Sequence, residues 1–469
     1  MGMGSTTFIQ EFEITGMFGY KDIRIEFKHP ILILIGENGY GKTTILNAIN
    51  YTIQGRYKEL LGIHFKTIRI KIGENTYQFD HDQLEEYYQS IHDDERRNGL
   101  VEYLKNNLTG SEFDALCAAV LRNQKITYKN FPNPIIQRFP RQMIEAELEN
   151  YLINERRFSV FLSLRNKIQS YNFNIMFEPT YRRVEADLGE DFINNRIERR
   201  RLVHRMESDD ERNQSYAAKI IRFGMSDVEE IIRKVTEKIQ TSSLQGFAKV
   251  SGDMIRQLLN VKPNVSVDHV HLDAKSIRII LGRTGNNLTD DEKQQFIDQI
   301  DKGELERNRY LNYFLEQLYE VYQSLEKYDT AIKQFTNVCN GYFTDKKFVY
   351  DESRVTLNIY RCKGDLILYD DNNIVKLGNL SSGEKQIVSL FAQIYLDIDK
   401  QFVMLLDEPE LSLSIFWQER LLDDIYKSGR CAFLLAVTHS PFIFRSNSMR
   451  QYVVGMQEFL SDGIRNEKE

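Results

Sequence analysis

The fold is decided by the stretch Gly36-Glu37-Asn38-Gly39-Tyr40-Gly41-Lys42-Thr43, which Thr44 follows. It fits a pattern of one glycine, any four residues, then glycine, lysine and a serine or threonine. Glycines in this pattern let consecutive backbone N–H groups curl around a phosphate, and the N-terminus of the next helix adds positive potential. Lys42 is expected to bind β- and γ-phosphate oxygens, and the Thr43 hydroxyl to bind magnesium. The predicted nucleotide contacts are Gly36, Asn38, Gly39, Gly41, Lys42, Thr43 and Thr44.

The segments on either side of this loop indicate an α/β fold. Ile31–Ile35 is wholly apolar, as expected of a strand buried on both faces, and the loop leads into an apolar helical pattern from Ile45 to Ile49. Four other short runs in this region favour strands with turns between them. They are Phe8–Ile14, Ile23–Phe27, Thr67–Ile72 and Thr76–Phe79.

Two motifs near the C-terminus provide polar groups at the ends of predicted strands. Phe402–Leu406 is followed by Asp407 and Glu408, and the carboxyl edge of an α/β sheet is where such folds bind ligands. Asp407 is predicted to hold magnesium and Glu408 to polarise an attacking water. The alternative is that acidic residues end the strand for solubility. His439 follows a predicted strand and either donates to a phosphate or is a satisfied edge residue.

A further motif is Leu380-Ser381-Ser382-Gly383-Glu384-Lys385-Gln386, which precedes an apolar helical pattern. A serine and glycine at a helix N-terminus present a hydroxyl, backbone N–H groups and the positive helix end to an anion. By itself the motif is also compatible with a simple helix N-cap.

The middle of the chain is predicted to be mainly helical. Residues 181–240 contain 13 basic and 13 acidic residues, so this stretch is a solvated face rather than a basic arm. Thr289 and Glu292 fit a capping box. Heptad spacing relates Leu311, Leu318, Leu325 and Ile332, and likewise Phe314, Val321, Tyr328 and Phe335. Two alternatives remain: a helix packed on one core, or an antiparallel coiled-coil arm that pairs with part of 190–240.

Composition excludes several classes of protein. The 469 residues are 42% hydrophobic and 28% charged with a net charge of -7, so no whole-protein basic field indicates nucleic acid, and any such surface must be local. The longest apolar run is far shorter than the roughly 20 residues of a membrane helix. The 4 cysteines lack metal-site spacing. We expect a cytoplasmic protein with no membrane partner.

In this order, the four motifs resemble those of ABC-type ATPases. GENGYGKT is similar to the Walker A motif, LSSGEKQ to the ABC signature, VMLLDEPE to Walker B with its catalytic glutamate, and THS to the switch histidine. The resemblance implies ATP and Mg²⁺ as cofactors, with Thr43 and Asp407 at the metal and Glu408 and His439 as catalytic residues. It also implies that two heads sandwich ATP, so that Ser381, Ser382, Gly383 and Glu384 of one copy cap the nucleotide held by the other. Gln124 is a candidate for the glutamine loop.

The spacing of the motifs indicates which group of ABC-type ATPases the chain resembles. Lys42 and Ser381 lie 339 residues apart, much further than in a transporter subunit, and the surplus is helical. This resembles the SMC, RecF and OLD group, although the insertion is too short for an SMC rod. Pro179-Thr180-Tyr181-Arg182-Arg183-Val184-Glu185 is similar to a segment of ATPase subunits from bacterial anti-phage systems such as PARIS, Septu and retrons.

The predicted architecture is an α/β ABC ATPase head split by a mainly helical, coiled-coil-like insertion. The head halves are assigned to 1–180 and 341–469, and the insertion to 181–340. The chain extends about 30 residues past His439 with no acidic cluster there, so we expect nuclease chemistry to come from a partner.

The leading hypothesis is a homo-oligomeric ATPase, a dimer of heads or a higher ring. It acts as sensor or scaffold in anti-phage defence, holds a separately encoded nuclease or toxin and responds to a phage protein. The alternative is a RecF/SMC-like repair ATPase that clamps DNA, using the basic cluster from Arg196 to Arg205.

Overall fold

The computed structural model describes residues 7–37, 39–97, 99–122, 124, 126, 133, 136–179, 219–220, 225–259, 274–283, 289–301 and 309–462. The chain forms two compact units. The first contains residues 1–218, 403–409 and 432–469, and the second contains residues 219–402 and 410–431. The predicted three-segment division of the chain stays a prediction.

The first unit contains an antiparallel sheet with the strand order β14-β2-β1-β4-β5. Its strands are β1 (Ile9–Met17), β2 (Lys21–Glu26), β4 (Thr67–Ile72), β5 (Asn75–Asp80) and β14 (Leu460–Asp462). Along β4 buried and partly exposed positions alternate, and Phe12 of β1 pairs with Ile25 of β2 and Ile70 of β4. This alternation buries one face of the sheet.

The second sheet of this unit positions the motifs. It contains β13 (Val453–Gly455), β3 (Ile31–Ile35), β12 (Cys431–Thr438), β11 (Phe402–Asp407) and β6 (Asn174–Glu178), in that order. β3 pairs in parallel with β12 and with β13, and Ile35 lies beside Thr438. The phosphate-loop motif and the histidine motif therefore leave the sheet at the same edge.

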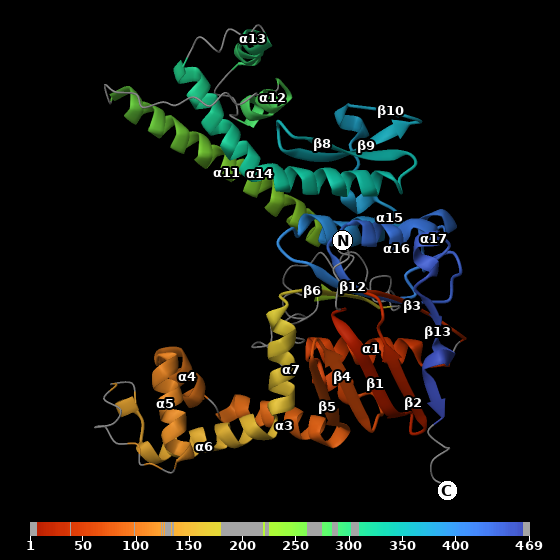
Figure 1. Ribbon diagram of the computed structural model, residues 1–469. Coiled ribbons are helices and arrows are strands. Elements are labelled where there is room, and N and C mark those ends of the chain that lie inside the picture. Colours follow the sequence, from red (N-terminus) through yellow and green to blue (C-terminus); the bar gives the residue numbers. More distant parts are fainter. Residues whose placement is uncertain are drawn as a thin grey trace. The chain divides into compact units, whose positions relative to one another are not determined.

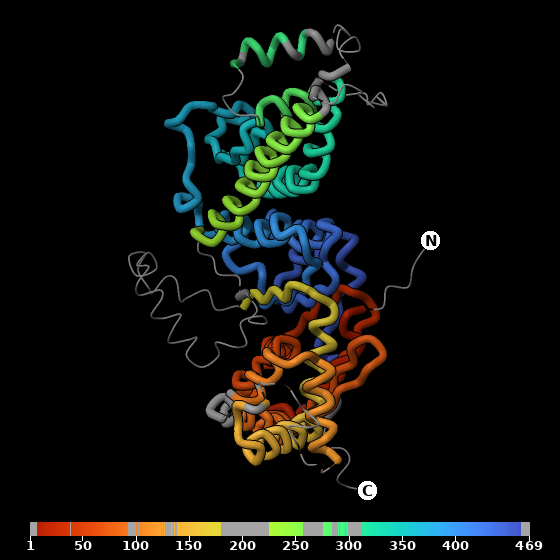
Figure 2. Tube along the Cα trace, turned by 90° about the vertical axis from the view of Figure 1, so that its left-hand side faces the viewer, coloured from red at the N-terminus to blue at the C-terminus, as the bar shows by residue number. Residues whose placement is uncertain are grey.

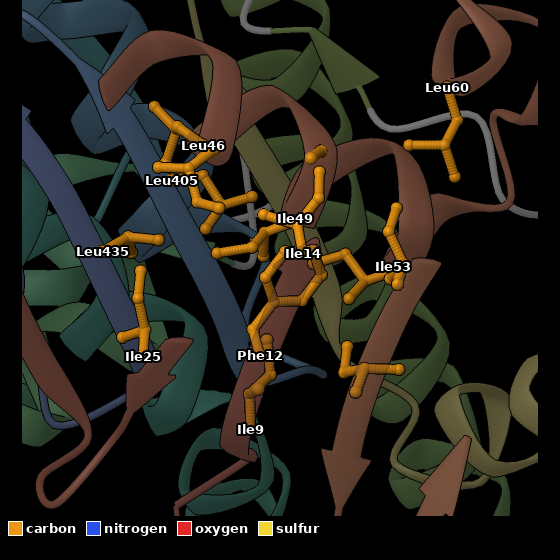
Figure 3. Packing of buried hydrophobic residues seen from close by; sticks show 14 of the residues in the cluster. Ile9, Phe12, Ile14, Ile25, Leu46, Ile49, Ile53, Leu60, Leu405 and Leu435 are labelled. Carbon is orange, nitrogen blue, oxygen red and sulfur yellow. The ribbon is translucent and has the colours of Figure 1, made fainter. Parts of the chain in front are cut away.

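Helix α1 (Lys42–Gln54) packs in the core that the two sheets share (Figure 3). Leu46, Ile49 and Ile53 of α1 lie in one buried cluster with residues of β1, β2, β11 and β12. The short helix α2 (Tyr57–Leu61) adds Leu60 to it. Because α1 begins at Lys42, this packing fixes the end of the helix that carries the phosphate loop.

A helical part of the first unit has a core of its own. It consists of α4 (Gly99–Asn107), α5 (Gly110–Leu121) and α6 (Arg141–Arg157). The flanking helices α3 (His81–Arg97) and α7 (Ser159–Ser170) contribute buried residues to the core of the sheets. Buried leucines and isoleucines of α4, α5 and α6 form a separate cluster. Figures 1 and 2 show these three helices gathered at one end of the unit, with α7 leading back to β6. The helical pattern predicted from residue 84 is confirmed here, but it overlooked β6.

The second unit contains the helical insertion. Helices α11 (Met225–Leu259) and α14 (Arg309–Asn340) run side by side (Figures 1 and 2). The rings of Phe247 and Phe314 meet edge to face between them, with centroids 5.9 Å apart. A helical pair is thus present as predicted, but this ring contact lies beyond the predicted partner segment 190–240. Of that segment, the described residues are 219–220 and 225–240.

Two shorter helices accompany this pair, α12 (Ala274–Arg283) and α13 (Asp290–Asp301). The predicted capping box precedes α13: the Thr289 N–H donates to Glu292 at 2.8 Å, and the Glu292 N–H donates to the Thr289 hydroxyl at 3.3 Å.

After α14 the second unit continues with a small antiparallel sheet and two helices. The strands are β8 (Lys346–Asp351), β9 (Thr356–Lys363) and β10 (Leu366–Ile367), and the helices are α15 (Ser382–Leu396) and α16 (Ile415–Lys427). The remaining elements are β7 (Lys219–Ile220), α17 (Asn447–Arg450) and single turns at Ile136–Arg138, Asp371–Asn373, Leu377–Asn379 and Met456–Phe459. The predicted class, α/β with a helical insertion, is confirmed.

Candidate functional site

The phosphate-loop motif joins β3 to α1 as predicted. Gly41 is the N-cap of α1 and has a φ of 86°, in the left-handed region that glycine adopts without strain. A Cβ atom at this position would lie 2.7 Å from the Met17 methyl carbon. The backbone conformation therefore favours glycine at this point, whereas the Met17 methyl group ends a flexible side chain that could move aside.

Lys42 is folded back onto its own loop. Its Nζ donates to the Gly36 carbonyl at 2.7 Å and to the Glu37 carbonyl at 2.9 Å, and the residue is only 5% exposed. Burial lowers the pKa of Lys42, while the negative charges of Glu408 and Asp407 oppose this shift. An incoming phosphate would offer the ammonium a charged acceptor in place of two neutral carbonyls.

Thr43 and Asp407 provide a pair of oxygen donors suited to magnesium. The Thr43 hydroxyl donates to Asp407 Oδ1 at 3.1 Å, and Asp407 is buried at the end of β11. No group of three or more His, Cys, Asp or Glu residues in the described part of the chain could hold a metal by itself. The pair nevertheless fits Mg²⁺, which typically takes one or two carboxylates and completes its shell with water and substrate phosphate.

Glu408 and His439 face each other across the ends of β11 and β12. Glu408 has a φ of 49°, and its N–H donates to the Val437 carbonyl at 2.8 Å. Its Oε1 lies 3.8 Å from His439 Nε2, and both side chains are partly exposed. A non-glycine residue in the left-handed region costs about 1–3 kcal/mol and is typical of functional turns. The turn here points the carboxylate toward the histidine.

These residues surround one cavity of about 230 Å³ in the first unit. Its lining residues are Phe18, Gly39, Gly41, Lys42, Thr43, Thr44, Glu408 and His439. Seven of these eight are predicted site residues that come from three separate parts of the sequence. Asp407 joins the cavity through Thr43, and Gly36 through Lys42.

Phe18 is the cavity residue that sequence reasoning missed. It lies in the turn between β1 and β2 with a φ of 57°, and it is 47% exposed. Lys21 Nζ lies 5.9 Å from the centre of this ring and donates to the Gly39 carbonyl at 2.9 Å. The available signal was Phe18-Gly19-Tyr20-Lys21 between the first two predicted strands, where aromatic and basic residues stand next to glycine.

The signature-like motif begins α15 in the second unit. Ser381 is its N-cap: the Ser381 hydroxyl accepts the Glu384 N–H at 3.4 Å, and Glu384 Oε2 accepts the Ser381 N–H at 2.7 Å. A Cβ on Gly383 would lie 2.9 Å from the Ser412 carbonyl oxygen and 3.1 Å from the Trp417 ring. Ser381 is thus the N-cap of α15, which was one of the two alternatives. This role is compatible with anion binding, because the Ser381 hydroxyl accepts one hydrogen bond and can still donate its own hydrogen to an anion.

Several predicted residues are not at the cavity or cannot be placed. Asn38, Arg182, Arg183 and the basic cluster from Arg196 to Arg205 lie outside the described residues. Gln124 is exposed after α5 and is not among the cavity-lining residues.

Comparison with protein-family models decides the family. The model for the AAA ATPase domain matches residues 8–444. The chain belongs to the AAA ATPase domain family. The match to this AAA ATPase domain extends from β1 past His439 and so includes both the cavity and the insertion.

Solved structures similar to this AAA ATPase chain include heads of SMC proteins. The Pyrococcus furiosus SMC head with an extended coiled coil, bound to the C-terminal domain of ScpA, has a TM-score of 0.33 and 13% identity and covers 98% of this chain and 95% of that chain. The SMC head with coiled coil and joint from Pyrococcus yayanosii has a TM-score of 0.29 and 13% identity, with coverages of 96% and 95%. No curated protein matches the chain. Among the described residues, every helix is too short or too polar to cross a bilayer.

Proposed function

We propose that the chain binds ATP with Mg²⁺ in the first-unit cavity and hydrolyses it to ADP and phosphate. The observation that supports this most directly is the grouping of Lys42, Thr43, Glu408 and His439 around one cavity, with Asp407 hydrogen-bonded to Thr43. These groups offer a cation for phosphate oxygens, oxygen donors for a metal, and a carboxylate and imidazole for a water.

Each side chain has one task in the proposed reaction. Lys42 exchanges the carbonyls of Gly36 and Glu37 for phosphate oxygens. Thr43 and Asp407 hold Mg²⁺, which neutralises phosphate charge when bound. Glu408 orients the attacking water and accepts its proton. His439 lies 3.8 Å from Glu408, within reach of the same water or of the terminal phosphate.

We further propose that a second copy completes the site. The cavity is lined by first-unit residues alone, whereas Ser381 and Gly383 begin a helix of the second unit. The resemblance to ABC-type heads supports a dimer in which Ser381, Ser382, Gly383 and Glu384 of one copy cap the nucleotide of the other. The exposed N-terminus of α15 provides a hydroxyl and helix N–H groups for that role.

Two biological roles fit such a dimer. The first is an anti-phage sensor or scaffold that holds a separately encoded nuclease or toxin, which the segment from Pro179 to Glu185 favours by resemblance. The second is a repair ATPase of SMC or RecF type that clamps DNA, and the basic cluster at 196–205 favours it.

ATP turnover by Glu408→Gln tests the proposed chemistry. Because loss of a general base typically costs about 10²–10⁴-fold, turnover should fall by that factor while ATP affinity stays unchanged. The matched control is Glu74→Gln, an exposed glutamate in the turn between β4 and β5, which should turn over ATP normally. Equal turnover by the two variants would refute the role of Glu408.

Two assays separate the biological roles. In the first, the chain is expressed with its neighbouring reading frames, and a fall in phage plating that Lys42→Ala abolishes would support defence. In the second, binding of a duplex DNA is measured with and without ATP. ATP-dependent affinity that drops steeply with salt would support the DNA clamp, because phosphate contacts release counterions.

A further inference from the structure

The signature-like turn is connected to the small sheet of the second unit by a partly buried ionic bridge. Lys346, the first residue of β8, donates from Nζ to Glu384 Oε1 at 2.9 Å and to Asp345 Oδ1 at 3.0 Å. The Lys346 side chain is 15% exposed and that of Glu384 is 9% exposed. In such a site the two charges hold a more specific geometry than an exposed pair would.

Glu384 has two partners at once. One carboxylate oxygen takes the Lys346 ammonium, and the other accepts the Ser381 N–H in the capping box. Glu384 returns its own N–H to the Ser381 hydroxyl. The position of the carboxylate therefore sets the turn that presents Ser381 and Gly383.

The strand that begins with Lys346 is in turn fixed to the long helix α14 at Phe348. Asn340, the last residue of α14, donates from Nδ2 to the Phe348 carbonyl at 2.9 Å, and its Oδ1 accepts the Phe348 N–H at 2.6 Å. Phe335 of α14 packs against Phe348 with ring centroids 5.2 Å apart. A continuous path thus leads from α14 through β8, Lys346 and Glu384 to Ser381.

We propose that Lys346 is a positioning residue that couples the helical insertion to the signature-like turn and so regulates how well one copy caps the ATP of the other. This inference rests on the proposed function. A change in the orientation of α14 would move β8. Lys346 would then shift the Glu384 carboxylate and with it the capping box. A partner bound on the insertion would then alter ATP-dependent dimerisation without touching the cavity.

The charge state of the bridge supports this role. Burial acts to lower the pKa of Lys346, but the hydrogen bonds to Glu384 and Asp345 outweigh it and raise this pKa above its ordinary value. The ammonium is therefore retained at neutral pH, and removal of Lys346 would leave the buried Glu384 carboxylate without its cation.

The test uses the full chain carrying Glu408→Gln, so that bound ATP persists, and adds Lys346→Met. The control is Lys347→Met, because the neighbouring Lys347 makes only a 3.8 Å ion pair with the exposed Asp365. Lys346→Met should raise the dimer dissociation constant with ATP by about 10-fold or more, as loss of a charged hydrogen bond does. The affinity of the single copy for ATP should not change, since Lys42 lies in the other unit. Lys346→Arg should restore dimerisation.

A second measurement follows hydrogen exchange at the amides of residues 381–384 in the nucleotide-free chain. Exchange should be faster in Lys346→Met than in Lys347→Met if the bridge sets the turn. Glu384→Gln keeps an acceptor for the Ser381 N–H but loses the charge, so it should show the same change if Lys346→Met does not fold. A merely structural lysine would lower the stability of the unit without separating dimerisation from ATP affinity.

The outcomes distinguish this inference from the proposed function. If the background chain dimerises with ATP and Lys346→Met matches Lys347→Met in both dimerisation and exchange, the inference is wrong and the proposed function stands. If the background chain does not dimerise, the proposed sandwich is wrong, and exchange at residues 381–384 alone decides whether Lys346 sets the turn.

Discussion

At the scale of single residues, Lys42 is where nucleotide binding should change the electrostatics most. In the free chain its ammonium is buried against two carbonyls, and burial lowers its pKa below the ordinary value of 10.5. Phosphate oxygens favour the charged form and raise the same pKa. Binding of ATP is therefore expected to be linked to proton uptake.

This linkage predicts the pH dependence of ATP affinity. As pH rises through the lowered pKa of free Lys42, the free chain loses a proton that the complex retains, so affinity falls by at most about tenfold per pH unit. Calorimetry in two buffers of different ionisation enthalpy should show proton uptake at alkaline pH below 10.5. Lys42→Met should abolish the uptake, whereas the exposed Lys28→Met should retain it. Uptake that persists in Lys42→Met would contradict this assignment.

Gly383 provides a second prediction for one residue. Gly383→Ala would place Cβ 2.9 Å from a backbone oxygen, that of Ser412, which can move only with its chain. Overpacking of this kind costs about 1–3 kcal/mol in the free energy of unfolding. Gly378→Ala is the control, since no heavy atom lies within 4 Å of a Cβ there. Urea denaturation compares the two, and an equal midpoint for both variants would rule out the clash.

The sequence predicted the residues around the cavity well because their motifs adjoin apolar strands. Ile31–Ile35 and Phe402–Leu406 are apolar runs long enough to be identified as buried strands. The polar residues of the site follow directly after them. Phe18 was missed because it has no motif, only a left-handed turn that brings it to the loop. The predicted contact of Glu384 with nucleotide stays a prediction. Its contacts with Ser381 and Lys346 were not foreseen, because Lys346 lies too far from Glu384 along the chain for any motif spacing to connect them.

At the scale of elements, the largely apolar strands β3 and β11 were predicted, whereas β6, of the same length as β3, was not. β6 (Asn174–Glu178) has five residues between helical patterns, and β11, one of its neighbours in the sheet, lies far away in the sequence. The pairing of α11 with α14 was predictable in kind from heptads. The ionic contacts that fix the neighbouring helix α12 were not, since nothing in a sequence shows which charges become buried.

The ion pair of Arg283 and Asp329 tests the packing of these elements. Arg283 ends α12, and its Nη2 lies 2.6 Å from Asp329 of α14, with side chains 5% and 0% exposed. Tyr350 of β8 donates to the same carboxylate oxygen at 2.5 Å. Arg283→Met would leave a buried charge uncompensated and should cost about 3–5 kcal/mol in the free energy of unfolding.

The control for this pair is Arg256→Met, whose side chain is 78% exposed and whose ion pair with Asp253 should be worth at most about 1 kcal/mol. Adding Asp329→Asn to Arg283→Met should recover part of the loss, since it removes the unpaired charge. If urea denaturation finds the two arginine variants equally stable, the buried pair does not hold α12 to α14.

At the scale of the whole molecule, we propose that ATP joins two copies of the chain. The chain has a net charge of -7, and its described cavity and signature-like turn belong to different compact units. With the site divided in this way, each copy has one phosphate loop that binds ATP and one N-terminus of α15 that can cap the ATP bound by the other copy. Symmetric pairing would then use both surfaces twice.

The most direct measurement is the mass in solution of the Glu408→Gln chain, by light scattering during gel filtration, with and without ATP and Mg²⁺. We expect a single copy without nucleotide and at least twice that mass with it, and adding Lys42→Ala should return the protein to a single copy. A mass that is the same with and without ATP would show that ATP does not join two copies.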